Sequence, residues 1–359
     1  MDVSDTSWAI GPFRRPVKRP IITPTEDLMF DCPMRKTAVR WARNHTFNPA
    51  ATVHEDKVQV LFRAEDGHGD QIAAYTSRIG KAVSKDGISF DIEPEPVIFP
   101  ANDGYVACEW YGGCEDPRVV RSSDDEFVAY YTMYNRDNPE GAAHKAVLGV
   151  ASSRDLRNWQ KHGAAFAKSG GITAYHKAAG VVQRVENGRL VATTLGGKYW
   201  MYWGERSVCL ATSDDLIHWT PVCDEQGRLV EVISPREGHF DSALSEVGPN
   251  PVLTDKGIVL MYNGKNHKEK GDPGVGDWAY APGQVLLDPD APWEVLDRLD
   301  QPFLKPDYEY EQGGQYAAGT VFAEGLVLFN GKWHLYYGCS DTYVGVASAP
   351  LRNAGAMER

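Results

Sequence analysis

The chain has 359 residues, 42% of them hydrophobic, and a formal net charge of −12. This length fits two average domains or one large β or barrel domain. The acidic charge, spread along the chain, argues against nucleic acid or an anionic membrane surface as a partner, because both select clustered Lys and Arg. The sequence contains no apolar run of about 18 residues, the length that a membrane-spanning helix needs.

Six cysteines are present, without C-x-x-C pairing or the spacing of zinc ligands. We therefore expect free thiols in a reducing compartment, and neither a metal nor an organic cofactor. The first 16 residues lack the charged segment and apolar run of a secretion signal. A cytoplasmic location is expected, or a periplasmic one if a signal was removed. The oligomeric state stays open, and a homo-oligomer is compatible with the sequence.

One pattern recurs along the chain after a proline-rich segment, residues 1–35, that is expected to wrap over the surface. Each copy has an opening with Pro or small residues, an apolar strand, a polar turn and a second apolar strand. A second half follows, as in 79–87, 148–156 and 209–216. Measured between equivalent positions, the spacings are 68, 62, 72 and 68 residues, for copies that open at Pro49, Pro117, Ala179, Pro251 and Gly319.

Each copy predicts four short strands joined by turns, and no sustained amphipathic helix is found. Five copies predict an all-β fold, a five-bladed β-propeller with its active site in the central channel. Two β-sandwich domains would instead need a linker near the middle of the chain. The expected single domain spans 1–359, with blades at roughly 36–100, 101–165, 166–235, 236–305 and 306–359.

Long loops are expected to decorate one face of this fold, because the repeat is longer than that of common propellers. In one of them, the lysine-rich stretch 265–270 is expected to be a mobile, solvated rim. The expected loops are 101–114, 135–146, 197–206, 233–249, 264–282 and 305–318.

The stretch Gly112–Val120 places an acidic pair, a proline and an arginine directly before an apolar run. A carboxylate at the mouth of a strand, beside a guanidinium and aromatic rings, suits acid chemistry on a polar substrate. Taken alone, the stretch is equally well a strand end held by an Asp–Arg pair. In a propeller, however, the first strand of every blade lines one channel. Candidates from strand openings and ends therefore converge there: Asn48, Arg63, Glu65, Asp66, Asp116, Arg118, Tyr134, Lys177, Asn250, Asn263, Tyr316 and Asp341.

Two further acids are candidates for catalysis with Asp116. Glu205 lies in an aromatic-rich loop, 199–206, and Glu246 lies just before the fourth repeat, downstream of the binding candidates His239 and Asp241. Hydrolysis of a glycoside needs one protonated acid and one carboxylate that activates water or attacks the sugar. A surface or strand-end salt bridge explains each acid equally well by itself. The sequence contains no G-x-S-x-G elbow, P-loop or H-E-x-x-H motif.

Four stretches together resemble glycoside hydrolase family 130: Gly113–Val119, Tyr131–Tyr134, Pro235–Ser242 and Tyr336–Asp341. The family holds β-mannoside phosphorylases and β-mannosidases with five-bladed propellers, and the resemblance covers about residues 35 to 350. It implies that Asp116 is the general acid, whose proton passes through a hydroxyl of the bound mannose. It also implies that the sugar pocket is lined by Asn48, Arg63, Asp66, Arg118, Lys177, Asp241 and Asp341.

The chain departs from the phosphorylase pattern where phosphate would bind. Tyr202–Glu205 replaces a His-Arg-Pro-like stretch, and Ala146–Leu148 stands where an arginine is expected, although such cations hold phosphate by charge-assisted hydrogen bonds. Glu205 and Glu246 match the acidic pair of the hydrolytic branch, which cleaves β-1,2-mannosides. The resemblance therefore implies an inverting exo-β-mannosidase that releases mannose from β-1,2-mannobiose or short oligosaccharides.

Three alternatives stay open. A β-mannoside phosphorylase would give mannose 1-phosphate, and Arg206 or Lys145 would then reach the anion. A non-catalytic sugar-binding propeller would need no acid. Another five-bladed glycosidase, acting on arabinosides or fructosides, would carry an early Trp-x-Asn-Asp-Pro motif, which this chain lacks.

Overall fold

The computed structural model describes residues 6–67, 75–135, 146–169 and 176–351. The expectation of an all-β protein is confirmed. Within these segments the chain forms 26 strands, a single-turn helix α1 (Val106–Glu109) and a 3-10 turn η1 (Glu309–Glu311). None of the helices in the described segments is long and apolar enough to cross a membrane.

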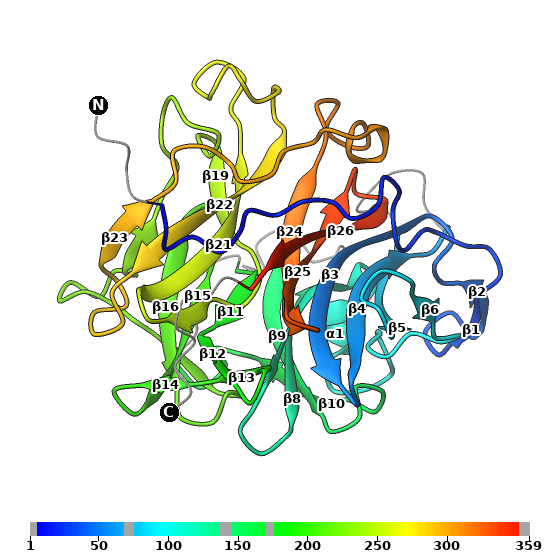
Figure 1. The fold of residues 1–359 in the computed structure, drawn as a ribbon. Coiled ribbons are helices and arrows are strands. Elements are labelled where there is room, and N and C mark those ends of the chain that lie inside the picture. Colours follow the sequence, from blue (N-terminus) through cyan, green and yellow to red (C-terminus); the bar gives the residue numbers. More distant parts are fainter. Residues whose placement is uncertain (1–5, 68–74, 136–145, 170–175, 352–359) are drawn as a thin grey trace.

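The first half of the chain forms two antiparallel meanders in one sheet (Figure 1). A single parallel pairing, of Ser77 with Gly113, joins the two meanders. A separate hairpin of β1 (Met29–Cys32) and β2 (Thr37–Arg40) precedes them in the sequence. The strands of the meanders are β3 (His45–His54), β4 (Lys57–Glu65), β5 (Ser77–Ser84), β6 (Asp91–Ile92), β7 (Gly113–Arg121), β8 (Phe127–Tyr134), β9 (Ala146–Ser153) and β10 (Gln160–Ala164).

The second half forms three further sheets. One contains β11 (Ala179–Val181), β14 (Thr194–Leu195), β15 (Lys198–Trp203), β16 (Val208–Ser213), β17 (Trp219–Pro221) and β18 (Glu231–Ile233). The next contains β12 (Gln183–Glu186), β13 (Arg189–Ala192), β19 (Leu244–Val247), β20 (Val252–Thr254), β21 (Gly257–Lys265), β22 (Tyr280–Leu287) and β23 (Val295–Arg298). The last contains β24 (Val321–Phe329), β25 (Lys332–Cys339) and β26 (Tyr343–Pro350).

The third copy of the repeat differs from the expected order. In this copy the segment after the polar turn is β13, which pairs with β12 beside β20 of the following sheet. The side chain of Asn250 lies at this crossing, where its Oδ1 accepts a hydrogen bond from the Val181 N–H at 2.9 Å. Gln183 then bonds to the backbone of Pro251 and Asn250. The partner of β11 is instead β15.

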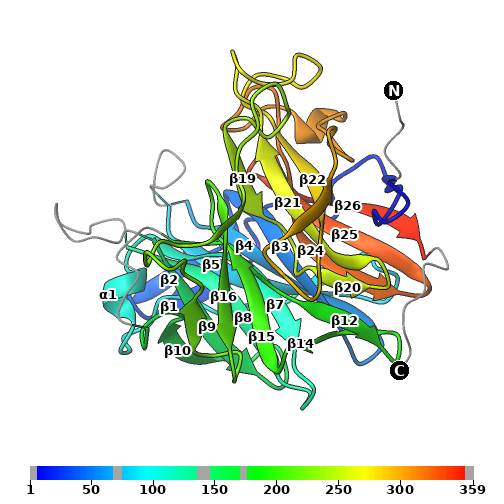
Figure 2. The same ribbon diagram turned by 90° about the vertical axis from the view of Figure 1, so that its left-hand side faces the viewer.

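The sheets pack on one another in a closed order of neighbours. Strand β3 contacts both β7 and β24, β7 contacts β11, β15 contacts β19, and β21 contacts β24. Figure 2 shows the same arrangement from the side, and Figure 1 shows the C-terminal sheet beside the N-terminal strand β3. Each sheet thus contacts the next, and the C-terminal sheet contacts the N-terminal strand β3.

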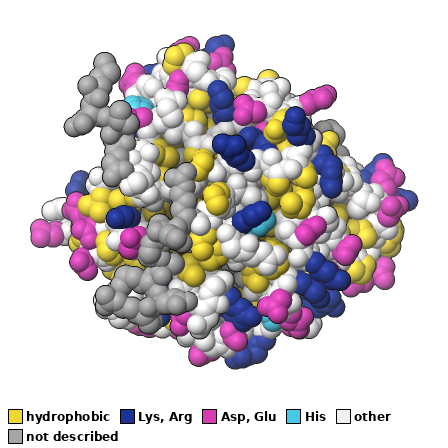
Figure 3. Space-filling model, in the orientation of Figure 1, with side chains coloured by type: hydrophobic (Ala, Val, Ile, Leu, Met, Phe, Trp, Pro, Cys, Tyr) yellow, Lys and Arg dark blue, Asp and Glu magenta, His cyan; other side chains and the backbone are white. Residues whose placement is uncertain are grey.

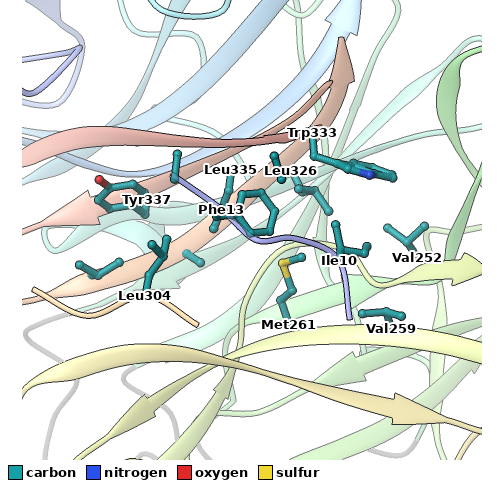
Figure 4. Close-up of a cluster of buried hydrophobic side chains, with 14 of the residues drawn as sticks. Ile10, Phe13, Val252, Val259, Met261, Leu304, Leu326, Trp333, Leu335 and Tyr337 are labelled. Atoms are coloured by element: carbon teal, nitrogen blue, oxygen red, sulfur yellow. The ribbon is translucent and has the colours of Figure 1, made fainter. Parts of the chain in front are cut away.

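The N-terminal segment is part of the core rather than a loose cover. Ile10 and Phe13 are buried against Val252, Met261 and Leu335 (Figure 4). Isolated bridges from Arg14 and Ile22 to β26 hold the same segment on the last sheet. A cavity of about 430 Å³ opens beside this cluster, at the turn between β20 and β21.

Candidate active site

Two β-bulges place polar side chains at the centre of the fold. The pairing register slips between Phe47 and Pro49, and the slip leaves Asn48 out of its ladder with a φ of 48°. A second slip, between Glu115 and Arg118, does the same for Asp116, with a φ of 47°. A bulge re-aims the side chain of its extra residue. The Asn48 amide consequently donates a hydrogen bond to Asp116 Oδ1 at 2.8 Å.

Arg63, at the end of β4, joins three carboxylates. Its guanidinium lies 2.6 Å from Glu65 Oε1, 2.9 Å from Glu115 Oε1 and 3.2 Å from Asp116 Oδ1. The ring of Phe47 lies under it, 4.7 Å from Cζ. A guanidinium offers five donors in a fixed plane, so one arginine holds this cluster of acids in place.

The two adjacent acids of this cluster differ in their pKa values. Burial raises the pKa of Glu115 to about 7, against the opposing charge of Arg63 and with a contribution from the Asp116 carboxylate. Burial also acts to raise the pKa of Asp116, but Arg63, Lys177 and the Asn48 amide outweigh it and hold that pKa below its ordinary value. The pair therefore keeps a proton on Glu115 more readily than on Asp116.

A second group of acids surrounds Lys177, which lies just before β11. The Lys177 ammonium is 3.4 Å from Glu205 Oε1 and 3.7 Å from Glu246 Oε1. Glu246 is 1% exposed on β19, and its Oε1 accepts no hydrogen bond from the described part of the chain. Burial raises the pKa of Glu246 to about 7; Lys177 opposes the shift and Glu205 adds to it. The predicted acids Glu205 and Glu246 thus lie together, next to a predicted cation.

Arg118 lies beneath both groups. It donates to the backbone carbonyls of Asp116 at 3.1 Å, Val247 at 2.6 Å and Gly248 at 3.2 Å. It also pairs with the fully buried Glu324 at 2.7 Å, and burial raises the pKa of Glu324 well above its ordinary value. These contacts join β7, the end of β19 and β24. They favour a positioning role for Arg118 over direct contact with a sugar.

The predicted residue Asp341 lies near Arg63 and Asp116, and the predicted residue Tyr316 lies near Lys265. Asp341 follows β25 with a φ of 48°, and its Oδ2 has no hydrogen-bond partner within the described segments. Burial raises the pKa of Asp341 to about 6, with Arg63 opposing the shift. The Tyr316 ring contacts Tyr280 and lies 4.1 Å from the Lys265 ammonium. Tyr134 ends β8, half-buried beside Gly112.

Four other predicted residues are held in separate networks. Asp66 pairs with Arg78 at 3.0 Å, and Asp241 pairs with Arg298 at 2.6 Å. The Asn263 amide exchanges two hydrogen bonds with the backbone of Ala323. His239 lies near the carboxylate of Asp300, at 3.4 Å. These contacts stabilise strand ends, and binding roles for Asp66, Asn263, Asp241 and His239 stay predictions.

Sequence reasoning missed three residues that the fold brings to this site: Glu115, Glu324 and Lys265. Glu115 was noted only as part of the acidic pair, and a role was assigned to its neighbour Asp116 alone. Glu324 carried a usable signal, because it is the one charge in the apolar run Val321–Phe329 and stands beside a glycine. Lys145, named as a possible phosphate ligand, lies outside the described residues.

The described side chains contain no group of three or more His, Cys, Asp and Glu arranged to hold a metal ion. On the face drawn in Figure 3, basic and acidic side chains are interspersed. The chemistry available to the described residues is therefore that of carboxylates held by Lys and Arg.

Comparisons with known proteins identify the family to which the chain belongs. The family model of β-1,4-mannooligosaccharide phosphorylase, glycoside hydrolase family 130, matches residues 13–355. The 1,2-β-oligomannan phosphorylase of Thermoanaerobacter sp. (strain X514) is 28% identical over 321 residues, 89% of this chain and 95% of that protein.

Two solved structures are more similar. One represents the glycoside hydrolases of family 130 that target β-1,2-mannosidic linkages in Candida mannan. It is 46% identical, with a TM-score of 0.92 over 98% of this chain and 97% of that chain. The other, a glycosyl hydrolase from Bacteroides ovatus, is 47% identical, with the same TM-score and coverage. The chain belongs to glycoside hydrolase family 130.

Proposed function

We propose that this protein is an inverting exo-β-mannosidase that hydrolyses β-1,2-linked mannosides and releases mannose. The observation that carries the proposal is the pair Glu205 and Glu246, which share the single ammonium of Lys177. Two carboxylates at this place repel a phosphate dianion but accept hydrogen bonds from water. The 46% identical structure of hydrolases that target β-1,2-mannosidic linkages supports the same assignment.

In the proposed reaction, Asp116 supplies a proton and water supplies the nucleophile. Glu115 and Asp116 share Arg63, and the proton that the two carboxyls retain near neutral pH resides mainly on Glu115, because the pKa of Glu115 is raised to about 7 while that of Asp116 is lowered. To act as the acid, Asp116 therefore has to receive this proton from Glu115 when the sugar binds. Asp116 delivers this proton to the glycosidic oxygen, by way of a sugar hydroxyl, as the bond to the anomeric carbon breaks. Glu246, with Glu205, takes a proton from the water that forms the new bond. The products are mannose with inverted configuration and the shortened saccharide.

The test of this reaction is mannose release from β-1,2-mannobiose in phosphate-free buffer and at saturating phosphate. We expect equal rates in both buffers and no mannose 1-phosphate. The rival function is a β-mannoside phosphorylase, which the phosphorylase relatives and the cations Lys177 and Lys265 favour. Strict dependence on phosphate, with mannose 1-phosphate as the product, would establish the phosphorylase and overturn hydrolysis.

Asp116→Asn separates catalysis from sugar binding alone. Asparagine keeps the size of the side chain but cannot deliver a proton, so we expect turnover to fall about 10²- to 10⁴-fold with binding of β-1,2-mannobiose retained. A non-catalytic sugar-binding protein would show no wild-type turnover to lose. Calorimetric binding of the disaccharide, measured beside the rate, distinguishes the two cases.

We also propose that the antiparallel units are the blades of one five-bladed β-propeller, with the boundaries expected from the repeat. The closed order of contacts between neighbouring sheets supports this proposal: β3 with β7, β7 with β11, β15 with β19, β21 with β24, and β24 with β3. The site then lies where the first strands of the blades meet. A crystal structure whose first strands do not surround a common axis would refute it.

A further inference from the structure

The loop between β21 and β22 holds an exposed tryptophan. Trp278 is 39% exposed, although large apolar side chains are usually covered. Its backbone has a φ of 62°, in the left-handed region that a bulky residue rarely adopts. The loop projects beyond the ends of its strands, next to the loop that precedes β24 (Figure 1, Figure 2). A strained and exposed position of this kind is typical of functional sites.

One buried amide gives this loop a fixed shape. Asn266 is 2% exposed, and its Nδ2 donates to the carbonyls of Asp272 at 3.1 Å and Val275 at 2.8 Å. Its Oδ1 accepts from the Asp272 N–H at 2.8 Å, and its backbone carbonyl accepts from the Trp278 N–H at 2.8 Å. The expectation that 265–270 is a mobile, solvated rim is therefore wrong at Asn266. The indole is presented by an ordered frame.

Lys265 connects this indole to the catalytic candidates. Its ammonium lies 5.8 Å from the centre of the Trp278 ring and 4.1 Å from that of Tyr316. Burial lowers the pKa of Lys265, while the nearby carboxylates of Glu205, Asp341 and Glu246 raise it. The lysine therefore stands between the aromatic rim and the acids. The Trp278 ring also packs against His267, with ring centres 4.6 Å apart.

We propose that Trp278 is a stacking platform for mannose units beyond the one that is cleaved off, with Lys265 donating hydrogen bonds to their hydroxyls. The apolar C–H face of a sugar ring packs on an indole, and an ammonium offers three donors and no acceptor. The preferred substrate is then a β-mannoside of three or more units. This inference rests on the proposed function.

The experiment compares kcat/KM for β-1,2-mannobiose and β-1,2-mannotetraose in wild type, Trp278→Ala and Trp278→Phe. We expect Trp278→Ala to lower the value for the tetrasaccharide about tenfold more than the value for the disaccharide, chiefly through KM. Trp278→Phe restores most of the difference, because it keeps a ring. The matched control is Trp293→Ala, which removes a 45% exposed indole outside this loop and should leave the ratio of the two substrates unchanged.

In the kinetic experiment, two outcomes overturn the proposal: equal losses on both substrates in Trp278→Ala, and a selective loss of the same size in Trp293→Ala. Calorimetric titration of β-1,2-mannotetraose into Asp116→Asn, with and without Trp278→Ala, needs no turnover. We expect Kd to rise about tenfold when the indole is removed. An unchanged Kd refutes the platform. Wild-type protein that binds the tetrasaccharide but releases no mannose would refute the proposed function instead.

Discussion

Replacing Glu246 with glutamine should stabilise the folded protein at high pH. Burial raises the pKa of Glu246 to about 7, compared with 4.5 for an ordinary glutamic acid. Between these two pH values the folded protein keeps a proton that the unfolded chain has released. The contribution of this side chain to stability is therefore fully present below pH 4.5 and is lost as the pH rises through about 7.

The size of the effect follows from the interval between the two pKa values. The interval from 4.5 to about 7 corresponds to a loss of about 3 kcal/mol in the free energy of unfolding at pH 8, and to almost no loss at pH 4. Glutamine keeps the shape of the side chain without the charge, so Glu246→Gln should raise the free energy of unfolding at pH 8 by up to about 3 kcal/mol. Urea denaturation of wild type and variant at both pH values measures the difference.

Glu237→Gln is the control, because Glu237 is exposed in the same part of the chain and its change should leave both free energies the same. A variant less stable than wild type at pH 8, or a gain of equal size at pH 4 and pH 8, would show that burial of the Glu246 charge does not destabilise the fold. The same variant should lose mannose release if Glu246 activates water. Gained stability with lost turnover would mark a residue kept for chemistry.

Three further changes test buried contacts of the fold by urea denaturation. Arg118→Met should cost about 3–5 kcal/mol, because Glu324 is left buried without its cation; added Glu324→Leu should recover much of that loss, and no recovery would contradict the assignment. Arg15→Met should cost a similar amount, because it leaves the buried Glu311 carboxylate without the cation that lies 2.6 Å from it. A neutral result would show that this contact of the N-terminal segment adds no stability. Gly80→Ala should cost about 1–3 kcal/mol, since its Cβ would lie 2.6 Å from the Trp41 ring.

The fold class was predictable because it depends on local pattern. Alternating strands and turns, repeated five times, required no knowledge of distant contacts, and the all-β prediction is confirmed. The exchange of β12 and β13 into the sheet of β20 was not predictable in the same way. It involves contacts between distant segments, such as the hydrogen bond that the Asn250 side chain, 69 residues beyond Val181, accepts from the Val181 backbone N–H. A bond between two distant segments leaves no trace in the periodicity of either.

The site was predictable to the extent that strand position decides burial. Asp116 stands at the opening of a strand in an unusual polar motif, and the fold does bring it to Asn48 and Arg63. The same reasoning named Asp66, which the fold pairs with Arg78 and whose role in binding a sugar stays a prediction. The position of a residue at the opening of a strand predicts that its side chain lies at the centre of the fold. The partner that it contacts there depends on how the sheets pack.

The charges at the centre connect this fold to its proposed chemistry. Among the described residues at the centre, seven carboxylates face four Lys and Arg side chains. The negative charges exceed the positive ones by three, or by two if His45 carries a charge. The acids are Glu65, Glu115, Asp116, Glu205, Glu246, Glu324 and Asp341, and the bases are Arg63, Arg118, Lys177 and Lys265.

Protons retained on Glu115 and Glu246 relieve this excess, as their raised pKa values indicate. A phosphate dianion would add two negative charges to this cluster and would have to bring protons with it. Water and a neutral sugar impose no such requirement. A site built in this way favours hydrolysis, and any phosphate that binds there should bind more weakly as the pH rises through 7.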